Sequence, residues 1–256
     1  MKTISIKAIE KYKKDGYLKI SNLISEKLVD TIKKEYKDYL NKISSLDKKK
    51  KRVLLAKKFN FISNPNRPSS VHRLKDNKKS FFFKLSKNKK FANIAEKLMG
   101  EKSKLQDLQF FFKNKEQNMP TPMHQDNAYW CYKNGKGLSI WIPLNKTNKK
   151  NGTLFYLKGS HNKDIPHNPS STTPGSSLII KKKLNYNKVS FKLNAGDCVI
   201  HDSKTVHGSY QNKLQKDRAA FIICFVTKRS TKDRKLEINY NNNLVKVNKS
   251  RLKLIN

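Results

Sequence analysis

Two histidines and one aspartate in this chain have the residue types and the order of a metal site. His124 and Asp126 are separated by one residue, and His207 follows further along the chain. Two imidazoles and one carboxylate bind non-haem Fe(II) from one side and leave its other positions open. Residues two apart in an extended strand point to the same side, so His124 and Asp126 are expected to converge on one ion without a bend in the backbone.

A cation follows the distal histidine. Arg218 lies eleven residues after His207, at the start of the apolar run from Ala219 to Val226. This spacing fits a short hairpin whose second strand returns the arginine to the side of the histidine. A planar guanidinium can bind a carboxylate through two parallel hydrogen bonds. The sequence therefore predicts a metal site that also binds a dicarboxylic co-substrate.

Several short motifs occur in a fixed order around these residues. They are His124-x-Asp126, Asn151-Gly152-Thr153-Leu154, Gly159-Ser160-His161, Ala195-Gly196-Asp197, and His207-Gly208-Ser209 with Asn212 and Arg218. Near the start, an Asp-Gly turn at Asp15-Gly16 stands between an expected helix and a short strand. In this order the motifs resemble the phytanoyl-CoA dioxygenase family, over about residues 8–228.

The resemblance implies a mainly β fold with flanking helices, built on a double-stranded β-helix, the jelly-roll core of the cupins. It also implies an Fe(II)- and 2-oxoglutarate-dependent oxygenase that binds its substrates at a defined set of positions. Carried over by position, these are His124, Asp126 and His207 for iron, Arg218 and Ser209 for the C5 carboxylate of 2-oxoglutarate, and Gln109 and Gln125 for further contacts with the co-substrate.

The reaction implied by the resemblance uses O2, converts 2-oxoglutarate to succinate and CO2, and hydroxylates an unactivated C–H bond. Asp126 is a carboxylate, whereas related halogenases have alanine or glycine at this position to admit a halide. Hydroxylation is therefore favoured over halogenation. Trp141 lies on an expected strand beside the first ligand pair, where it could line the substrate pocket or belong to the core. The substrate itself, a small molecule, is not specified by these motifs.

A second histidine stands before the distal ligand. The pair His201-Asp202 occurs six residues before His207, where apolar or small residues are more usual in the family. The offset to Arg218 favours His207 as the ligand, because His201 lies seventeen residues from that arginine with no cation at the matching distance. His201 and Asp202 are then either unrelated to the site or a support for it.

Composition is compatible with one domain. The chain has 256 residues, of which 36% are hydrophobic, and its 13 Phe and 10 Tyr can build a core from few positions. We expect a single domain over residues 1–228, with an N-terminal helical layer at 1–46 and the jelly-roll core at 105–228. Residues 229–256 are expected to form a basic tail.

The formal net charge of +38, from 57 Lys and Arg against 19 Asp and Glu, is typical of proteins that bind nucleic acid or anionic surfaces. The lysines are spread along the whole chain together with many Asn and Ile, as a compositional bias would produce. We therefore favour compositional drift over nucleic-acid binding. A positive field would still steer anionic small molecules toward the site.

Cysteine usage indicates a reducing compartment. Cys131, Cys198 and Cys224 are odd in number and widely spaced, so neither a disulfide framework nor a structural zinc site is expected. No apolar run approaches the roughly 20 residues needed to cross a bilayer. The sequence thus favours the cytosol, and it does not indicate an oligomeric state.

Local patterns predict the elements that position these residues. A helix is expected over 26–43 with Ser25 as its N-cap, and another over 91–99 that ends at Gly100. Strands are expected at residues 105–113, 137–144, 153–157, 189–193, 198–201 and 219–227. The basic run 47–52, the segment 60–70 at the mouth of the site, and a lid at 166–177 are expected to be loops.

Two other functions remain open from the residues alone. One is a basic binding module that uses the jelly-roll scaffold without catalysis, which a salt-sensitive gel shift would support. The other is a metal-dependent enzyme that does not use 2-oxoglutarate, such as a cupin isomerase. His124, Asp126, His207 and Arg218 argue against the first, and Arg218 argues against the second.

Overall fold

The computed structural model describes residues 4–45, 59–60, 70–113, 119–170, 178–214 and 216–252. The expected basic loop at 47–52 lies outside the described residues, as do most of segment 60–70 and the second half of the expected lid. No helix in the described ranges is long and apolar enough to span a membrane.

The N-terminal region follows the expected pattern of helix, turn, strand and helix. These elements are α1 (Ile6–Asp15), β1 (Tyr17–Ile20) and α2 (Glu26–Ser44). Gly16 makes the turn between α1 and β1 with φ +82°, a left-handed conformation that suits glycine. Ser25 accepts a hydrogen bond from the amide of Leu28, as an N-cap does. The expected helix that ends at Gly100 is α5 (Lys89–Met99), preceded by the short α4 (Phe81–Ser86).

Most strands form two antiparallel sheets that face each other. The larger sheet has seven strands in the order β1, β11 (Cys198–Asp202), β6 (Gly137–Pro143), β13 (Arg218–Thr227), β4 (Ser103–Lys113), β3 (Ser70–Val71) and β2 (Phe59–Asn60). The smaller sheet has four, in the order β10 (Lys188–Ser190), β7 (Leu154–Leu157), β12 (His207–Ser209) and β5 (Thr121–His124). A separate pair is formed by β8 (Asn168–Pro169) and β9 (Leu178–Ile179). The expected jelly-roll architecture is confirmed.

The central strands β6 and β13 of the seven-stranded sheet divide their side chains between two compartments. Successive side chains of a strand point to opposite faces. On β13, Phe221 and Ile223 join the core cluster that includes the helices, whereas Ile222 and Cys224 join the cluster between the two sheets. The larger sheet therefore carries apolar side chains on both faces, and its inner face forms one wall of an interior space.

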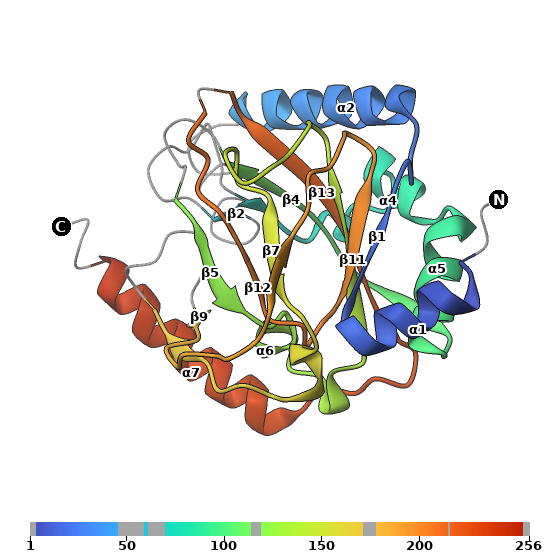
Figure 1. Cartoon of the computed structure of the whole chain (residues 1–256). Helices are drawn as coiled ribbons and strands as arrows, with labels where there is room; N and C mark the ends of the chain where they lie inside the picture. The colour runs from blue at the N-terminus through green and yellow to red at the C-terminus, as the bar shows by residue number, and fades with distance from the viewer. Residues whose placement is uncertain are drawn as a thin grey trace.

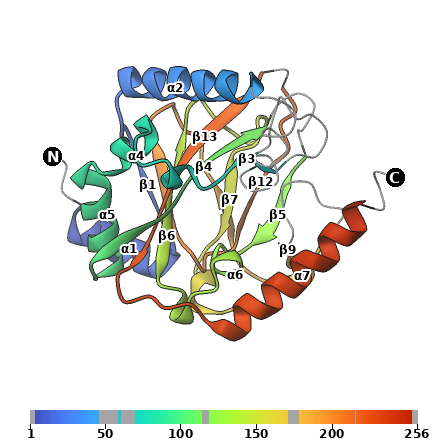
Figure 2. The ribbon, with the colours of Figure 1, turned by 180° about the vertical axis from the view of Figure 1, so that it is seen from behind.

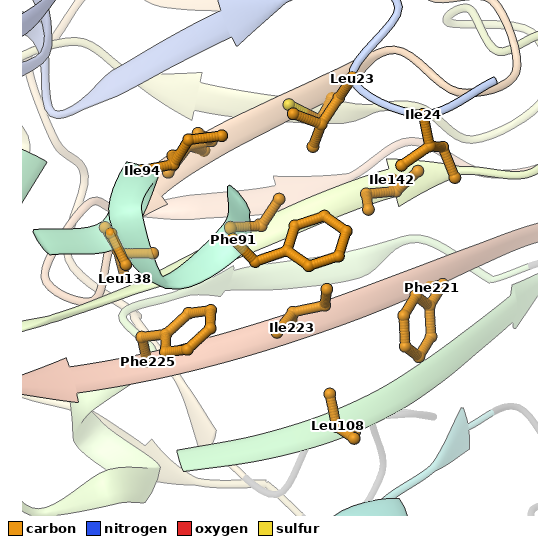
Figure 3. Close-up of a cluster of buried hydrophobic side chains, with 14 of the residues drawn as sticks. Leu23, Ile24, Phe91, Ile94, Leu108, Leu138, Ile142, Phe221, Ile223 and Phe225 are labelled. Atoms are coloured by element: carbon orange, nitrogen blue, oxygen red, sulfur yellow. The ribbon is translucent and has the colours of Figure 1, made fainter. Parts of the chain in front are cut away.

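The outer face of the larger sheet is covered by α1, α2, α4 and α5 (Figures 1 and 2). Figure 3 shows Phe91 of α5 between Ile142 and Ile223, with Ile94 and Leu138 nearby. Phe91 and Ile223 are almost fully buried, and removal of each such side chain from water contributes about 2–3 kcal/mol. The helical layer thus anchors the wall from behind and leaves its inner face for function.

The segment expected as a basic tail contains a helix, α7 (Arg234–Leu252), which lies along the edge of the molecule opposite α2 (Figure 1). Its Tyr240 ring lies 5.8 Å from the ring of Tyr129 in α6 (Asn127–Trp130). The amide of Asp233 donates a hydrogen bond to the carbonyl of Cys131. Part of the residues beyond 228 therefore belongs to the folded body beside α6.

Gly16 offers a test of how the N-terminal turn is joined to the site loops. A Cβ at Gly16 would lie 2.5 Å from His161 Nδ1 and from Thr205 Oγ1, whereas a Cβ at Gly100, with φ +72°, would meet no atom within 4 Å. Left-handed alanine costs roughly 1–2 kcal/mol at either position. We expect Gly16→Ala to cost at least about 1 kcal/mol more than Gly100→Ala, because overpacking is added to strain. Urea unfolding of both variants measures the difference in the free energy of unfolding, and equal losses would contradict the prediction.

Candidate metal centre between the two sheets

A cavity of about 70 Å³ lies between the inner faces of the two sheets. Its walls come from β4, β6, β11 and β13 on one side and from β5, β7 and β12 on the other. Seven of the eight predicted site residues line it, namely Gln109, His124, Asp126, Trp141, His207, Ser209 and Arg218. Gln109 and Arg218, which are 109 positions apart in the chain, therefore share one small space.

The three candidate ligands meet at one wall of this cavity. His124 ends β5 and His207 begins β12, and the two residues are direct partners in the antiparallel register. The Nε2 atoms of both histidines lie 3.7 Å from Oδ1 of Asp126. One ligand atom from each of the three residues lies within 4.8 Å of the other two. Strand pairing thus brings the histidines together, and the aspartate approaches both.

The position of Asp126 differs from the expectation of a continuous strand. β5 ends at His124, and Asp126 is the N-cap residue of α6 with right-handed helical backbone angles (φ −57°, ψ −36°). The expected extended geometry is therefore wrong, although the convergence it predicted is present. The turn into α6 directs the carboxylate toward the histidines.

Backbone carbonyls select the tautomer of both candidate ligands. His124 Nδ1 lies 2.9 Å from the carbonyl oxygen of Pro122, and His207 Nδ1 lies 2.9 Å from that of Thr205. A carbonyl oxygen only accepts hydrogen bonds, so each Nδ1 carries the proton and each Nε2 presents its lone pair. Both imidazoles are oriented as metal ligands are.

The charges of the site agree with metal binding. Burial lowers the pKa of His124 and lowers that of His207 well below its usual value, with neighbouring imidazoles adding to the effect on His207. Burial opposes ionisation of Asp126, but the imidazoles of His207 and His201 outweigh it and hold its pKa below the usual range. At neutral pH the site offers two neutral imidazoles and one carboxylate, the donor set that suits Fe(II).

The second oxygen of Asp126 is also engaged. Ser139 Oγ donates a 2.7 Å hydrogen bond to Oδ2, and His201 Nε2 lies 3.3 Å from the same atom. His201 is therefore part of the site, which the sequence left open. Ser139 was not anticipated. The signal available for it is the alternation along β6, which puts Ser139 on the same face as Trp141.

Arg218 reaches the cavity from the opposite sheet. β12 pairs with β5 and β7, whereas β13 pairs with β4 and β6, so the expected hairpin between His207 and Arg218 is wrong. The chain crosses between the sheets, and Arg218 faces the histidines across the cavity. Its guanidinium carbon lies 5.6 Å from the ring centre of Trp141, and its buried Nε has no hydrogen-bond partner among the described residues.

The positive charge at this end of the cavity belongs to Arg218. Burial lowers the pKa of Arg218 to about 10, which leaves it charged at neutral pH. Lys113 is its direct partner on β4, and burial together with the Arg218 charge lowers the pKa of Lys113 to about 6. Lys113 is thus mostly neutral at pH 7 and does not compete for an anion.

The remaining predicted residues have different environments. Ser209 Oγ accepts a hydrogen bond from the amide of Thr121, and Gln109 donates to Asp107, both at the cavity. Gln125 lies outside it. The Gln125 side chain bonds the backbone of Lys163, Lys204 and Ile165. It therefore holds the segment before the expected lid, in place of the expected contact with a co-substrate.

Comparison with known proteins agrees with this geometry. The model of the phytanoyl-CoA dioxygenase family matches residues 12–220. A relative from Dictyostelium discoideum, a homolog of phytanoyl-CoA dioxygenase domain-containing protein 1, is 26% identical over 129 residues, 48% of this chain. The matched region is 46% of that protein, so this chain aligns with about half the length of that relative.

Two solved structures share the fold. The non-haem α-ketoglutarate-dependent carbocyclase SnoK, from nogalamycin biosynthesis, aligns with a TM-score of 0.69 and 19% identity, over 90% of this chain and 87% of its own. EctD from S. alaskensis, solved with 2-oxoglutarate and 5-hydroxyectoine, aligns with a TM-score of 0.69 and 18% identity, over 90% and 78%. Because the family model matches most of this chain, the chain belongs to the phytanoyl-CoA dioxygenase family.

Proposed function

We propose that this protein hydroxylates an unactivated C–H bond of a small molecule, with Fe(II), 2-oxoglutarate and O2, and releases succinate and CO2. The observation that carries the proposal is the shared cavity, in which a two-histidine, one-carboxylate donor set faces a buried arginine. The class of enzyme, a 2-oxoglutarate-dependent non-haem iron oxygenase, follows from the family and from this donor set.

The ligands have separate tasks in this proposal. His124 Nε2, His207 Nε2 and Asp126 Oδ1 would hold Fe(II) from the side of β5 and β12. Bound iron supplies the site at which 2-oxoglutarate and O2 react. The carbonyls of Pro122 and Thr205 keep each Nδ1 protonated, so that neither imidazole turns its other nitrogen toward the metal.

Arg218 and Ser209 would bind the far carboxylate of 2-oxoglutarate. The guanidinium offers paired donors, and its unpartnered Nε is consistent with a site built for an anion. Ser209 adds a hydroxyl on the facing strand β12. Trp141 presents its ring to the guanidinium and limits water around it. In these low-dielectric surroundings an ion pair with the carboxylate is stronger than it would be in water.

Hydroxylation is the finer part of the proposal. The related carbocyclase indicates that this scaffold also supports ring closure. The carboxylate of Asp126 supports hydroxylation over halogenation, because it fills the position that a halide would need. Once a substrate is known, labelled O2 decides between the reactions, because hydroxylation adds one labelled oxygen atom to the product and ring closure adds none.

The setting of the reaction is also part of the proposal. All three cysteines are buried and free, which is consistent with the cytosol. The formal net charge of +38 would raise the local concentration of anionic substrates such as 2-oxoglutarate. We propose a small-molecule substrate and no nucleic-acid partner.

The metal ligands can be tested before the substrate is known. Anaerobic addition of Fe(II) and 2-oxoglutarate to the protein is expected to produce a visible charge-transfer band. His124→Ala or His207→Ala is expected to abolish the band, because each removes one of three ligands. His161→Ala is the matched control, since the His161 side chain bonds the Lys13 carbonyl instead of facing the metal. A full band in His207→Ala would exclude His207 as a ligand.

The role of Arg218 predicts a change in co-substrate binding. Arg218→Ala is expected to weaken 2-oxoglutarate binding by roughly 10- to 100-fold, in line with about 1.5–3 kcal/mol for hydrogen bonds to a charged group. Titration of the charge-transfer band measures the change. Arg229→Ala is the control, because Arg229 is exposed and pairs with Glu101.

A second comparison separates recognition of the carboxylate from general damage. The keto acid 2-oxobutyrate lacks the far carboxylate, so its binding is expected to change little in Arg218→Ala. Equal weakening for both keto acids would contradict the assigned role of Arg218.

A further inference from the structure

We infer that His201 and Ser139 together hold Oδ2 of Asp126, so that Asp126 binds the metal through Oδ1 alone and His201 is a positioning residue, not a ligand. This inference rests on the proposed function, because it concerns the same metal. It assigns a role to the histidine that the family pattern does not use.

The two oxygens of Asp126 have different neighbours. Oδ1 lies 3.7 Å from the Nε2 atoms of both candidate ligands, His124 and His207. Oδ2 accepts the hydrogen bond from Ser139 at 2.7 Å and lies 3.3 Å from His201 Nε2. An oxygen with two donors in place is a poor partner for a metal. The geometry therefore separates a metal-binding oxygen from a held oxygen.

Both donors come from the larger sheet, whereas Asp126 follows a strand of the smaller one. His201 of β11 and Ser139 of β6 are direct partners in the antiparallel register. Their side chains therefore leave the sheet side by side on its inner face. The larger sheet thus fixes the rotation of a carboxylate that follows a strand of the smaller sheet. Hydrogen bonds to a metal ligand of this kind tune metal affinity.

The hydrogen bonding of His201 argues against a simple packing role. A carboxylate only accepts, so His201 must donate from Nε2, and in a neutral ring Nδ1 is then a bare acceptor. That Nδ1 is buried and has no hydrogen-bond partner among the described residues. A buried polar atom without a hydrogen-bond partner destabilises the folded state by about 1–3 kcal/mol. The ring also contacts His207 at 4.2 Å and Tyr156 at 5.4 Å between ring centres, contacts that phenylalanine would make without the cost.

The consequence for the reaction is the number of open metal positions. One oxygen from Asp126 and two imidazoles leave three positions of an octahedral ion for a chelating co-substrate and O2. A carboxylate that rotated to bind through both oxygens would occupy a fourth. His201 and Ser139 prevent this rotation.

The test measures metal affinity and stability separately. Mn(II), which is stable in air at neutral pH, is titrated into metal-free protein and the free ion is followed by electron paramagnetic resonance. His201→Phe is expected to lower Mn(II) affinity by roughly 10- to 100-fold, because loss of a hydrogen bond to a metal-ligating residue typically weakens metal binding to this extent. The melting temperature of the metal-free variant is expected to change little, because removal of the unpartnered Nδ1 offsets the loss of the hydrogen bond to Asp126.

Two further variants make the result specific. His201→Gln keeps an amide donor and is expected to recover part of the affinity lost in His201→Phe. Ser139→Ala removes the other donor and is expected to lower affinity in the same direction. Unchanged affinity in His201→Phe, or a loss of affinity matched by a loss of stability in the metal-free protein, would overturn the inference.

A ligand role for His201 has a distinct signature. Pulsed electron paramagnetic resonance of the Cu(II)-loaded protein counts coordinated imidazoles, and two are expected in both the wild type and His201→Phe. A third imidazole that disappears in His201→Phe would overturn the inference while leaving the metal site in place. Wild-type protein that binds no Mn(II) would instead overturn the proposed function together with it.

Discussion

The carboxylate of Asp126 is the interaction on which the site depends. Two imidazoles approach one of its oxygens, and a hydroxyl and a third imidazole approach the other. These groups come from both sheets, so the carboxylate joins the two walls of the cavity at one point. A partly buried carboxylate of this kind needs such partners, because an isolated charge would be neutralised by a shift of its pKa.

Besides the groups around Asp126, the space between the sheets contains several polar atoms that lower the stability of the fold. Arg218 Nε, His201 Nδ1 and the Tyr156 hydroxyl are all buried without hydrogen-bond partners among the described residues. Each lies at the space between the sheets, and each costs stability that a wholly apolar interior would retain. Such groups tend to gather where function requires them. The apolar helical layer behind the larger sheet provides the compensating burial.

Because the larger sheet has two faces, one face can stabilise the fold while the other carries the polar groups of the site. β13 and β6 send large apolar side chains outward to the helices, and send Ile222, Ser139 and Trp141 inward. The outward half stabilises the fold, so the inward half is free to carry polar and charged groups. A one-residue shift of either strand would exchange the two sets and remove the site.

Sequence alone determined the ligand types, the flanking arginine and most strands of the larger sheet. These features could be predicted because apolar alternation, glycine turns and capping residues act over a few positions. The short strands β5 and β12 were expected only as extended backbone at the ligands, without bounds, because three or four residues carry too little pattern. The helix α7 was missed for a similar reason, since its apolar residues do not gather on one side.

Only the tertiary structure decided how the parts meet. It turned Asp126 into a helix cap, moved Arg218 to the sheet facing His207, took Gln125 out of the cavity, and brought His201 and Ser139 to the same carboxylate oxygen. Local patterns report which way a side chain faces along its own strand. The distance between groups 75 residues apart, such as Asp126 and His201, depends on how two sheets pack, and no short-range pattern encodes that.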